Sequence, residues 1–290
     1  MDSDSVSLYR AAYDRYLTEN NDLLEPSQKF LPFDFAWLAE VKWRNLGYHM
    51  VEDELRELTN IINQWNSYLR RWHKWNLVLE EWEGDDAWRL RREFLEALVH
   101  HCMLQPSSIR DAFTYIATNS IHQIRLSAEN EYKDYLDGEP KSPKDKPVFL
   151  SRRKKEQRLK RVLSNLPNSR EFLESLYLLN DKAYKMITSD YRNRVNHAIA
   201  PRLGLGITQM VTRNVKQKTE MERQPDGTYQ LIPVEGEMQV SYGFGGVEPL
   251  DYEQVRQSNL QQFFLTDECY RNYIKLLKSG IENMPRVTVE

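Results

Sequence analysis

An apolar stripe between Glu52 and Trp82 constrains the fold of this chain more than any other feature. Its members recur at steps of three or four residues, with one double step of seven after Trp72: Leu55, Leu58, Ile62, Trp65, Leu69, Trp72, Leu79 and Trp82. This spacing puts the apolar side chains on one face of an α-helix. The sequence therefore predicts a long amphipathic helix here, whose apolar face must be covered by other elements.

The segments that follow continue the helical pattern in shorter lengths. The turn 84–86, Gly-Asp-Asp, is expected to end the long helix and to cap the next one. That helix is predicted to stop at Pro106, because proline lacks the N–H that an interior helix position donates. Ser108 and Asp111 resemble a capping box that opens a further helix through Ile124. Together these segments predict an antiparallel stack of helices.

The segment from Asp137 to Pro147 is the best candidate for a boundary, because its prolines and its glycine cannot continue a helix. We expect a tryptophan-rich helical region over 1–136, a loop or linker over 137–150, and a helical core with a β insertion over 151–290. The alternative is that the loop decorates a single body in which both regions pack together.

The second half of the sequence changes its pattern twice. Residues from Val211 to Val240 are typical of strands, and Pro225-Asp226-Gly227 is typical of a hairpin turn. The span from Tyr252 to Ile281 returns to helical spacing. The predicted fold class is therefore mainly α: a helical bundle with a small antiparallel β-hairpin or meander inserted before the last helix.

Composition limits the classes of partner. The net charge of -3 argues against coating nucleic acid by bulk charge, so such a partner needs a local basic patch. Cys102 and Cys269 lack the spacing of a zinc or disulfide motif, and no nucleotide-binding, zinc-protease or serine-hydrolase motif occurs. We therefore expect no metal and no cofactor. The absence of a signal sequence and of a long apolar run predicts a cytoplasmic protein without a membrane partner.

Two groups of side chains each allow two interpretations. A basic run, Arg152, Arg153, Lys154 and Lys155, is followed by Arg158, Lys160 and Arg161. Such a run is usually a solvated helix face, and the alternative is a docking surface for RNA phosphates. The seven tryptophans, all between Trp37 and Trp88, could stack on bases, but their helical spacing favours core packing.

The pattern Arg192-Asn193-x-x-x-His197 carries the most chemistry. Histidine exchanges a proton near neutral pH, and arginine holds a phosphate and the charge that develops on it during attack. The same pattern occurs at Arg44 and His49, where Gly47 interrupts the helical spacing. We prefer the second copy, and the first is either a second motif or a coincidence.

The pattern at 192–197 resembles the signature of the HEPN superfamily, and it looks most like an uncharacterised bacterial branch of it. The resemblance covers residues 168–201 and implies a small helical bundle that dimerises, so that two motifs form one composite site. It implies a metal-independent endoribonuclease with Arg192, Asn193 and His197 as catalytic residues, acting in phage defence or as a toxin. RNA, a second copy, and an antitoxin or other protein are the implied partners.

Arg152, Arg153, Lys154, Lys155 and Arg194 are the residues that we expect to bind the substrate. On a regular helix, Arg192 and His197 lie roughly 140° apart, so Arg192 reaches the site only from the first turn or from a partner copy. Asn193 and His197 share a face. The competing hypothesis is a non-catalytic HEPN-like module that binds nucleotide, RNA or a protein partner.

Overall fold

The computed structural model describes residues 3–19, 29–146 and 148–287. The chain divides into two compact units, one formed by Met1–Thr188 with Glu253–Glu290 and the other by Ser189–Tyr252. We call the first the helical unit and the second the hairpin unit. Each is described by itself.

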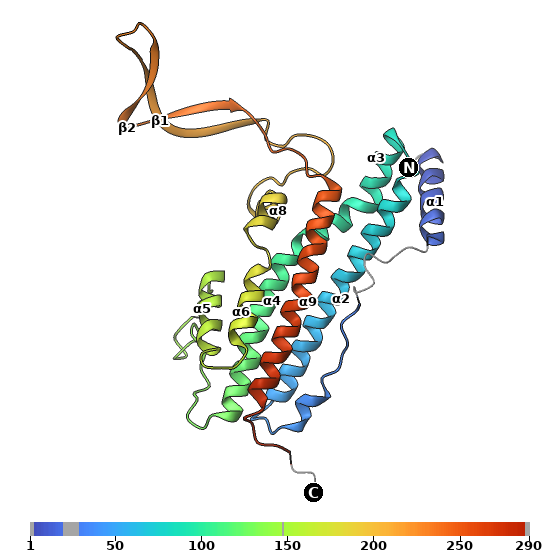
Figure 1. Cartoon of the computed structure of the whole chain (residues 1–290), viewed down its shortest axis with the longest axis vertical. Coiled ribbons are helices and arrows are strands. Elements are labelled where there is room, and N and C mark those ends of the chain that lie inside the picture. The colour runs from blue at the N-terminus through green and yellow to red at the C-terminus, as the bar shows by residue number, and fades with distance from the viewer. Residues whose placement is uncertain (1–2, 20–28, 147, 288–290) are drawn as a thin grey trace. The chain divides into compact units, whose positions relative to one another are not determined.

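Three long helices form the centre of the helical unit: α2 (Gly47–Leu79), α4 (Glu96–Ala128) and α9 (Tyr252–Ile281). They lie side by side in Figure 1. Buried hydroxyl groups connect α9 to α2 and α4 by hydrogen bonds. The hydroxyl oxygens of Thr59 and Tyr270 lie 3.0 Å apart, and the Tyr273 hydroxyl donates to that of Ser120 at 2.9 Å. The predicted bounds of the last helix, Tyr252 to Ile281, are confirmed.

The long helix predicted from the apolar stripe is α2, although it begins five residues before Glu52 and ends at Leu79 rather than at Trp82. Trp65 and Trp72 have no exposed surface, which confirms core packing for these members of the stripe. Trp88 lies outside the stripe and is 43% exposed. The short helix α1 (Ser3–Thr18) packs on α2, where the rings of Tyr16 and Trp75 stack at 4.6 Å.

The predicted helix end at Pro106 is wrong. After α3 (Gly84–Leu90) and a π-helical turn, η2 (Arg91–Leu95), helix α4 runs through Pro106, and Ser108 and Asp111 lie inside it rather than capping it. An interior proline costs roughly 3 kcal/mol, whereas each buried large apolar side chain contributes about 1.5–3 kcal/mol. Apolar side chains are buried on both sides of it: Val99, Cys102, Met103, Ile109, Phe113 and Ile116. Packing against neighbouring helices therefore outweighs the local breaker.

The helical unit also contains the short 3₁₀ helix η1 (Ala36–Glu40) and three shorter α-helices: α5 (Arg152–Val162), α6 (Ser169–Leu178) and α7 (Lys182–Ile187). The loop between α4 and α5 does not separate the two units, because residues 1–136 and 151–188 belong to the same one. This arrangement matches the alternative in which both regions pack together. Pro147 lies outside the described residues. The chain instead divides at Ser189 and again at Tyr252.

The hairpin unit contains the short helix α8 (Tyr191–His197) and two antiparallel strands, β1 (Val211–Arg223) and β2 (Tyr229–Phe244). The turn between the strands includes Gly227, whose φ of 85° favours glycine. The predicted hairpin is confirmed and consists of two strands. The fold is therefore mainly α, with a small antiparallel sheet before the last helix.

Side chains on the two faces of this hairpin differ in character. Opposed residues such as Val215 and Val240 point to the same face, and every second residue along β1 joins them together with its partner on β2. A register shift between Gln217 and Thr219 changes the alternation on β2, so Tyr229 and Leu231 share this face with Val240. That face carries large side chains that are at least 48% exposed: Val211, Val215, Met221, Tyr229, Leu231, Met238, Val240, Tyr242 and Phe244. The opposite face pairs Thr212 with Gly243 and Asn214 with Ser241. The hairpin is thus amphipathic, and we call its first face the apolar face.

Across residues 3–19, 29–146 and 148–287, no helix is long and apolar enough to cross a membrane.

Candidate functional site

Helix α8 contains the Arg-Asn-x-x-x-His pattern, and a backbone turn rather than a capping side chain sets where it begins. Ser189 and Asp190 precede it with φ angles of 51° and 52°, and the Asp190 carbonyl accepts hydrogen bonds from the N–H groups of Asn193 and Arg194, each at 3.0 Å. The Asp190 side chain makes no capping hydrogen bond. The tight turn before Tyr191 therefore puts Arg192 in the first turn of the helix.

The motif side chains are accessible. Tyr191 is buried and anchors the helix, Arg192 is half-buried, and Asn193 and His197 are exposed. Among the described residues, the side chains of Arg192, Asn193 and His197 have no hydrogen-bond or ion-pair partner. Nothing in this part of the chain competes for the guanidinium or the imidazole, so both can contact a ligand.

Arg194 lies on the same short helix as the motif. It is half-buried, and its Nη1 lies 3.5 Å from the amide oxygen of Gln209, in the segment that leads into β1. This long hydrogen bond is weak. The structure therefore places Arg194 on the same helix as Arg192, Asn193 and His197. The positive charge of Arg194 stays available to a ligand.

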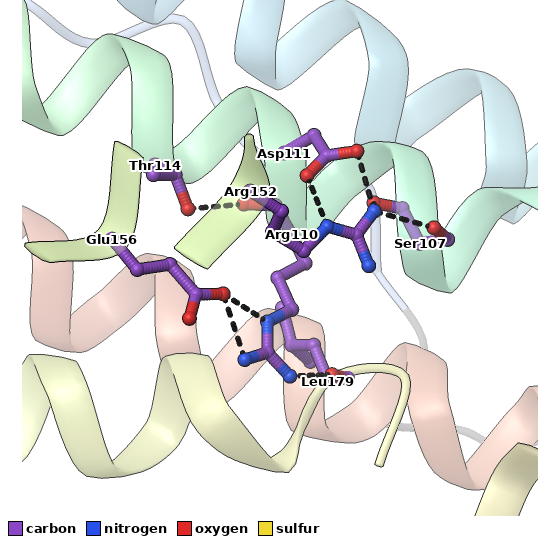
Figure 2. Close-up of polar contacts among 7 residues, drawn as sticks. All are labelled: Ser107, Arg110, Asp111, Thr114, Arg152, Glu156 and Leu179. Carbon is purple, nitrogen blue, oxygen red and sulfur yellow. Dashed lines mark hydrogen bonds and ion pairs between the residues drawn. The ribbon is translucent and has the colours of Figure 1, made fainter. Parts of the chain in front are cut away.

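The basic run belongs to the helical unit, on the first turns of α5. Figure 2 shows that Arg152 turns toward α4, where its Nε donates to Asp111 at 2.7 Å and its Nη2 donates to Ser107 at 2.8 Å. Arg153, Lys154 and Lys155 are exposed. Arg152 therefore holds the helix in place, while the next three residues present free charge to solvent.

A second arginine, on α4, holds the same face of α5 one turn further along. Arg110 of α4 donates two hydrogen bonds to one carboxylate oxygen of Glu156, at 3.0 and 2.8 Å, and a third to the carbonyl of Leu179 at 3.0 Å (Figure 2). Both ionised side chains are largely buried, with 15% and 17% of their surface exposed. Such a charge-assisted contact is strong and directional. Together with Arg152, it sets the face that α5 turns outward.

The first copy of the pattern has a different environment. Arg44 precedes α2, and its Nη2 donates to the side-chain oxygen of Asn130 at 3.2 Å. His49 lies within the first turn of α2 and is exposed, with its ring against that of Tyr48. The helix begins at Gly47, between the two residues, so this copy is divided between a loop and a helix.

One unusual carboxyl group in the helical unit, that of Glu54, could not be recognised from the sequence. Glu54 of α2 accepts a hydrogen bond from the Asn119 amide of α4 at 2.6 Å, and its second oxygen is buried without a partner in the described structure. Burial raises the pKa of Glu54 to about 7. In the sequence Glu54 is one of many acidic residues on an amphipathic helix, and only the packing of α4 against α2 distinguishes it.

No group of three or more histidine, cysteine, aspartate or glutamate side chains in the described chain is arranged to hold a metal ion. In comparisons with models of protein families, with curated proteins and with solved structures, nothing matches this chain.

Proposed function

We propose that this protein is a metal-independent endoribonuclease of the HEPN type, with Arg192, Asn193 and His197 as its catalytic residues. The observation that carries the proposal is the state of α8: an arginine in the first turn and an exposed histidine in the last, neither with a partner among the described side chains. A general base and a phosphate ligand are the two groups that RNA cleavage without a metal needs.

The proposed reaction is a transesterification. His197 acts as general base or general acid: a base removes the proton of a ribose 2′-hydroxyl, whose oxygen attacks the adjacent phosphorus. The bond to the 5′-oxygen breaks, and an acid returns a proton to that oxygen, which leaves a 2′,3′-cyclic phosphate and a 5′-hydroxyl. Arg192 stabilises the charge on the pentavalent phosphorus. Asn193, one turn before His197, orients the imidazole or contacts the substrate.

A homodimer is part of the proposal. On one regular helix Arg192 and His197 point roughly 140° apart, so a site that uses both is completed most simply by a second copy. The apolar face of the hairpin supports this, because a two-stranded hairpin alone is marginally stable in water and exposed apolar patches are typical of interaction surfaces. The hairpin and α8 belong to the same unit, so pairing through the hairpin would bring two motifs into one assembly.

The RNA backbone is proposed to contact Arg194 beside the motif and the exposed charges of Arg153, Lys154 and Lys155. Arg152 contributes indirectly, by holding α5 against Asp111. Such phosphate contacts weaken with salt, so binding should fall steeply as ionic strength rises. The biological role proposed with this activity is phage defence or a toxin, with an antitoxin as a further partner.

The test is cleavage of mixed RNA in EDTA by the chain and by Arg192→Ala, His197→Ala and His49→Ala variants. We expect the native chain to release fragments with 2′,3′-cyclic phosphate ends. The first two variants should lose about 100-fold or more in rate, because general acid–base and electrostatic contributions are typically of that size. The His49→Ala variant is the matched control, since it removes an exposed histidine on another helix.

Equal cleavage by all four proteins would assign the activity to a contaminant. Intact RNA with a native, partner-free chain would favour the second candidate, a non-catalytic HEPN-like module. The exposed apolar face of the hairpin favours a protein ligand for such a module.

A further inference from the structure

A small cavity lies in the helical unit where the end of α4, the following loop and α5 meet. Its volume is about 200 Å³, and arginines line it from two helices: Arg125 of α4, and Arg158 and Arg161 of α5. Tyr132 and Tyr135 of the loop form part of its wall. This volume is well above the roughly 10–15 Å³ that a single water needs. The cavity therefore has room for a small charged ligand.

The three arginines are not equally neutralised. Arg125 forms a bidentate ion pair with Glu129, at 2.8 and 2.9 Å, and Arg161 pairs with the exposed carboxylate of Asp137 at 2.6 Å. Among the described residues, Arg158 donates only to the backbone carbonyl of Asp137, at 3.1 Å. Its Nε is buried and has no acceptor within the described structure. Arg125 and Arg161 therefore each have a carboxylate partner, and Arg158 has none in the part of the chain that the structure describes.

The aromatic wall is held in place before any ligand binds. The guanidinium of Arg125 lies 4.5 Å from the centre of the Tyr132 ring. The Tyr132 hydroxyl lies 3.0 Å from Nδ1 of His122, and the other ring nitrogen of His122 lies 2.9 Å from a carboxylate oxygen of Asp134. Because His122 itself is buried, this chain of contacts fixes the ring. Such preorganisation lowers the entropic cost of binding.

Tyr135 differs from Tyr132 in that the residue is 37% exposed. The ammonium of Lys141 lies 5.4 Å from the centre of the ring, which adds a further positive charge at this wall. Tyr135 lines the same cavity as the guanidinium of Arg158, and an accessible tyrosine ring in such a place can stack against a flat group that is attached to an anion.

We infer that this cavity binds a small phosphate monoester that carries a flat ring. The phosphate oxygens accept hydrogen bonds from Arg158 and Arg161, whose forked donors match a tetrahedral oxyanion, and the ring stacks on Tyr135. Asp137 is the acidic side chain in the wall. Because it is exposed and already engages Arg161, it leaves Arg158 as the principal ligand of the phosphate. This inference does not depend on the motif of α8.

The test is calorimetric titration of the full chain with phenyl phosphate, inorganic phosphate, phenol and adenosine monophosphate. Phenyl phosphate should bind more tightly than inorganic phosphate, and phenol should not bind. Adenosine monophosphate shows whether a sugar and a base are accommodated as the flat group. Binding of phenol alone, or no binding of either phosphate, would overturn the inference.

Three variants make the test specific to the residues. Arg158→Gln should weaken phenyl phosphate binding at least 10-fold, because it removes a charge-assisted contact. Tyr135→Ala should reduce the preference for phenyl phosphate over inorganic phosphate about 5-fold and leave inorganic phosphate unchanged. Arg170→Gln, which removes an exposed ion-paired arginine of α6, is the control and should bind like the native chain.

Correct folding is checked by circular dichroism. Should the Arg158→Gln variant not fold, Arg161→Gln serves in its place, since its ion pair with Asp137 is exposed. Native affinity for phenyl phosphate in a folded variant of either arginine would contradict the inference.

Discussion

Helix α2 of the helical unit and the two strands of the hairpin unit place their large apolar side chains in opposite environments. Along α2, Leu55, Leu58, Trp65, Leu69, Trp72 and Trp75 are at most 5% exposed, because neighbouring helices that include α1, α4 and α9 pack against them. In the hairpin unit the apolar residues of β1 and β2 are largely exposed. Burial of apolar surface is the main driving force of folding. The helical unit therefore contains its own source of stability, whereas the apolar face of the hairpin offers surface to another molecule.

A matched pair of phenylalanines gives the largest expected difference between the units. Phe113 of α4 has no exposed surface, and Phe244 of β2 is 96% exposed. We expect Phe113→Ala to reduce the free energy of unfolding by about 3–5 kcal/mol, the usual cost of a cavity of that size. At a concentration where the chain is monomeric, Phe244→Ala should change it by less than about 0.5 kcal/mol. Urea denaturation of both variants measures this, and a large loss for Phe244→Ala would show that its side chain is covered.

The second comparison concerns the two faces of the hairpin. Val240→Lys puts a charge on the apolar face, and Asn214→Lys puts the same charge on the opposite face. If two copies pair through the apolar face, each substitution acts twice, so Val240→Lys should weaken the dimer about 100-fold, or about 2.7 kcal/mol. Asn214→Lys should leave the dimer intact.

Sedimentation velocity over a range of concentrations measures this effect. A dimer that is equally stable in both lysine variants would show that the copies associate elsewhere. A monomer in all three proteins would remove the homodimer from the proposed function.

The elements of both units could largely be predicted from the sequence, because hydrophobic periodicity and turn residues are local signals. The stripe of α2, the hairpin turn at Gly227 and the last helix follow from such signals. Pro106 misled the prediction because burial on both sides of it is a property of the packed helices and not of its neighbours in sequence. The predicted boundary in the loop after α4 likewise depended on local proline and glycine residues and did not take helix packing into account.

The candidate site was less predictable than the fold. The sequence could identify Arg192 and His197 as a pair, but it could not separate Arg152, which is bound to Asp111, from the exposed charges that follow it. Arg125 gave no signal, since its meeting with Arg158 requires α4 and α5 to pack together. Chemistry that depends on contacts between distant helices is visible only in three dimensions.

The smallest expected effect is a difference between the two units in how their stability depends on pH. In the helical unit, burial raises the pKa of Glu54 from its ordinary value of 4.5 to about 7. In the hairpin turn, hydrogen bonds from Thr228 lower the pKa of the exposed Asp226. Between about pH 4.5 and 7 the folded state retains a proton on Glu54 that the unfolded state has lost, so stability falls as pH rises. The hydrogen-bonded turn at Asp226 instead weakens when the pH falls below the ordinary aspartate range.

Glu54→Gln should remove the first of these dependences while keeping an acceptor for the amide of Asn119. After allowance for solvent screening of this partly exposed group, we expect a gain of about 1–2 kcal/mol at pH 8 and almost none at pH 4. Urea denaturation at both pH values measures the gain, with Glu57→Gln on the exposed side of α2 as the control. An equal gain at both pH values would mean that the gain does not come from titration of the Glu54 carboxyl group, and that the cost of burying its charge is not what destabilises the native chain.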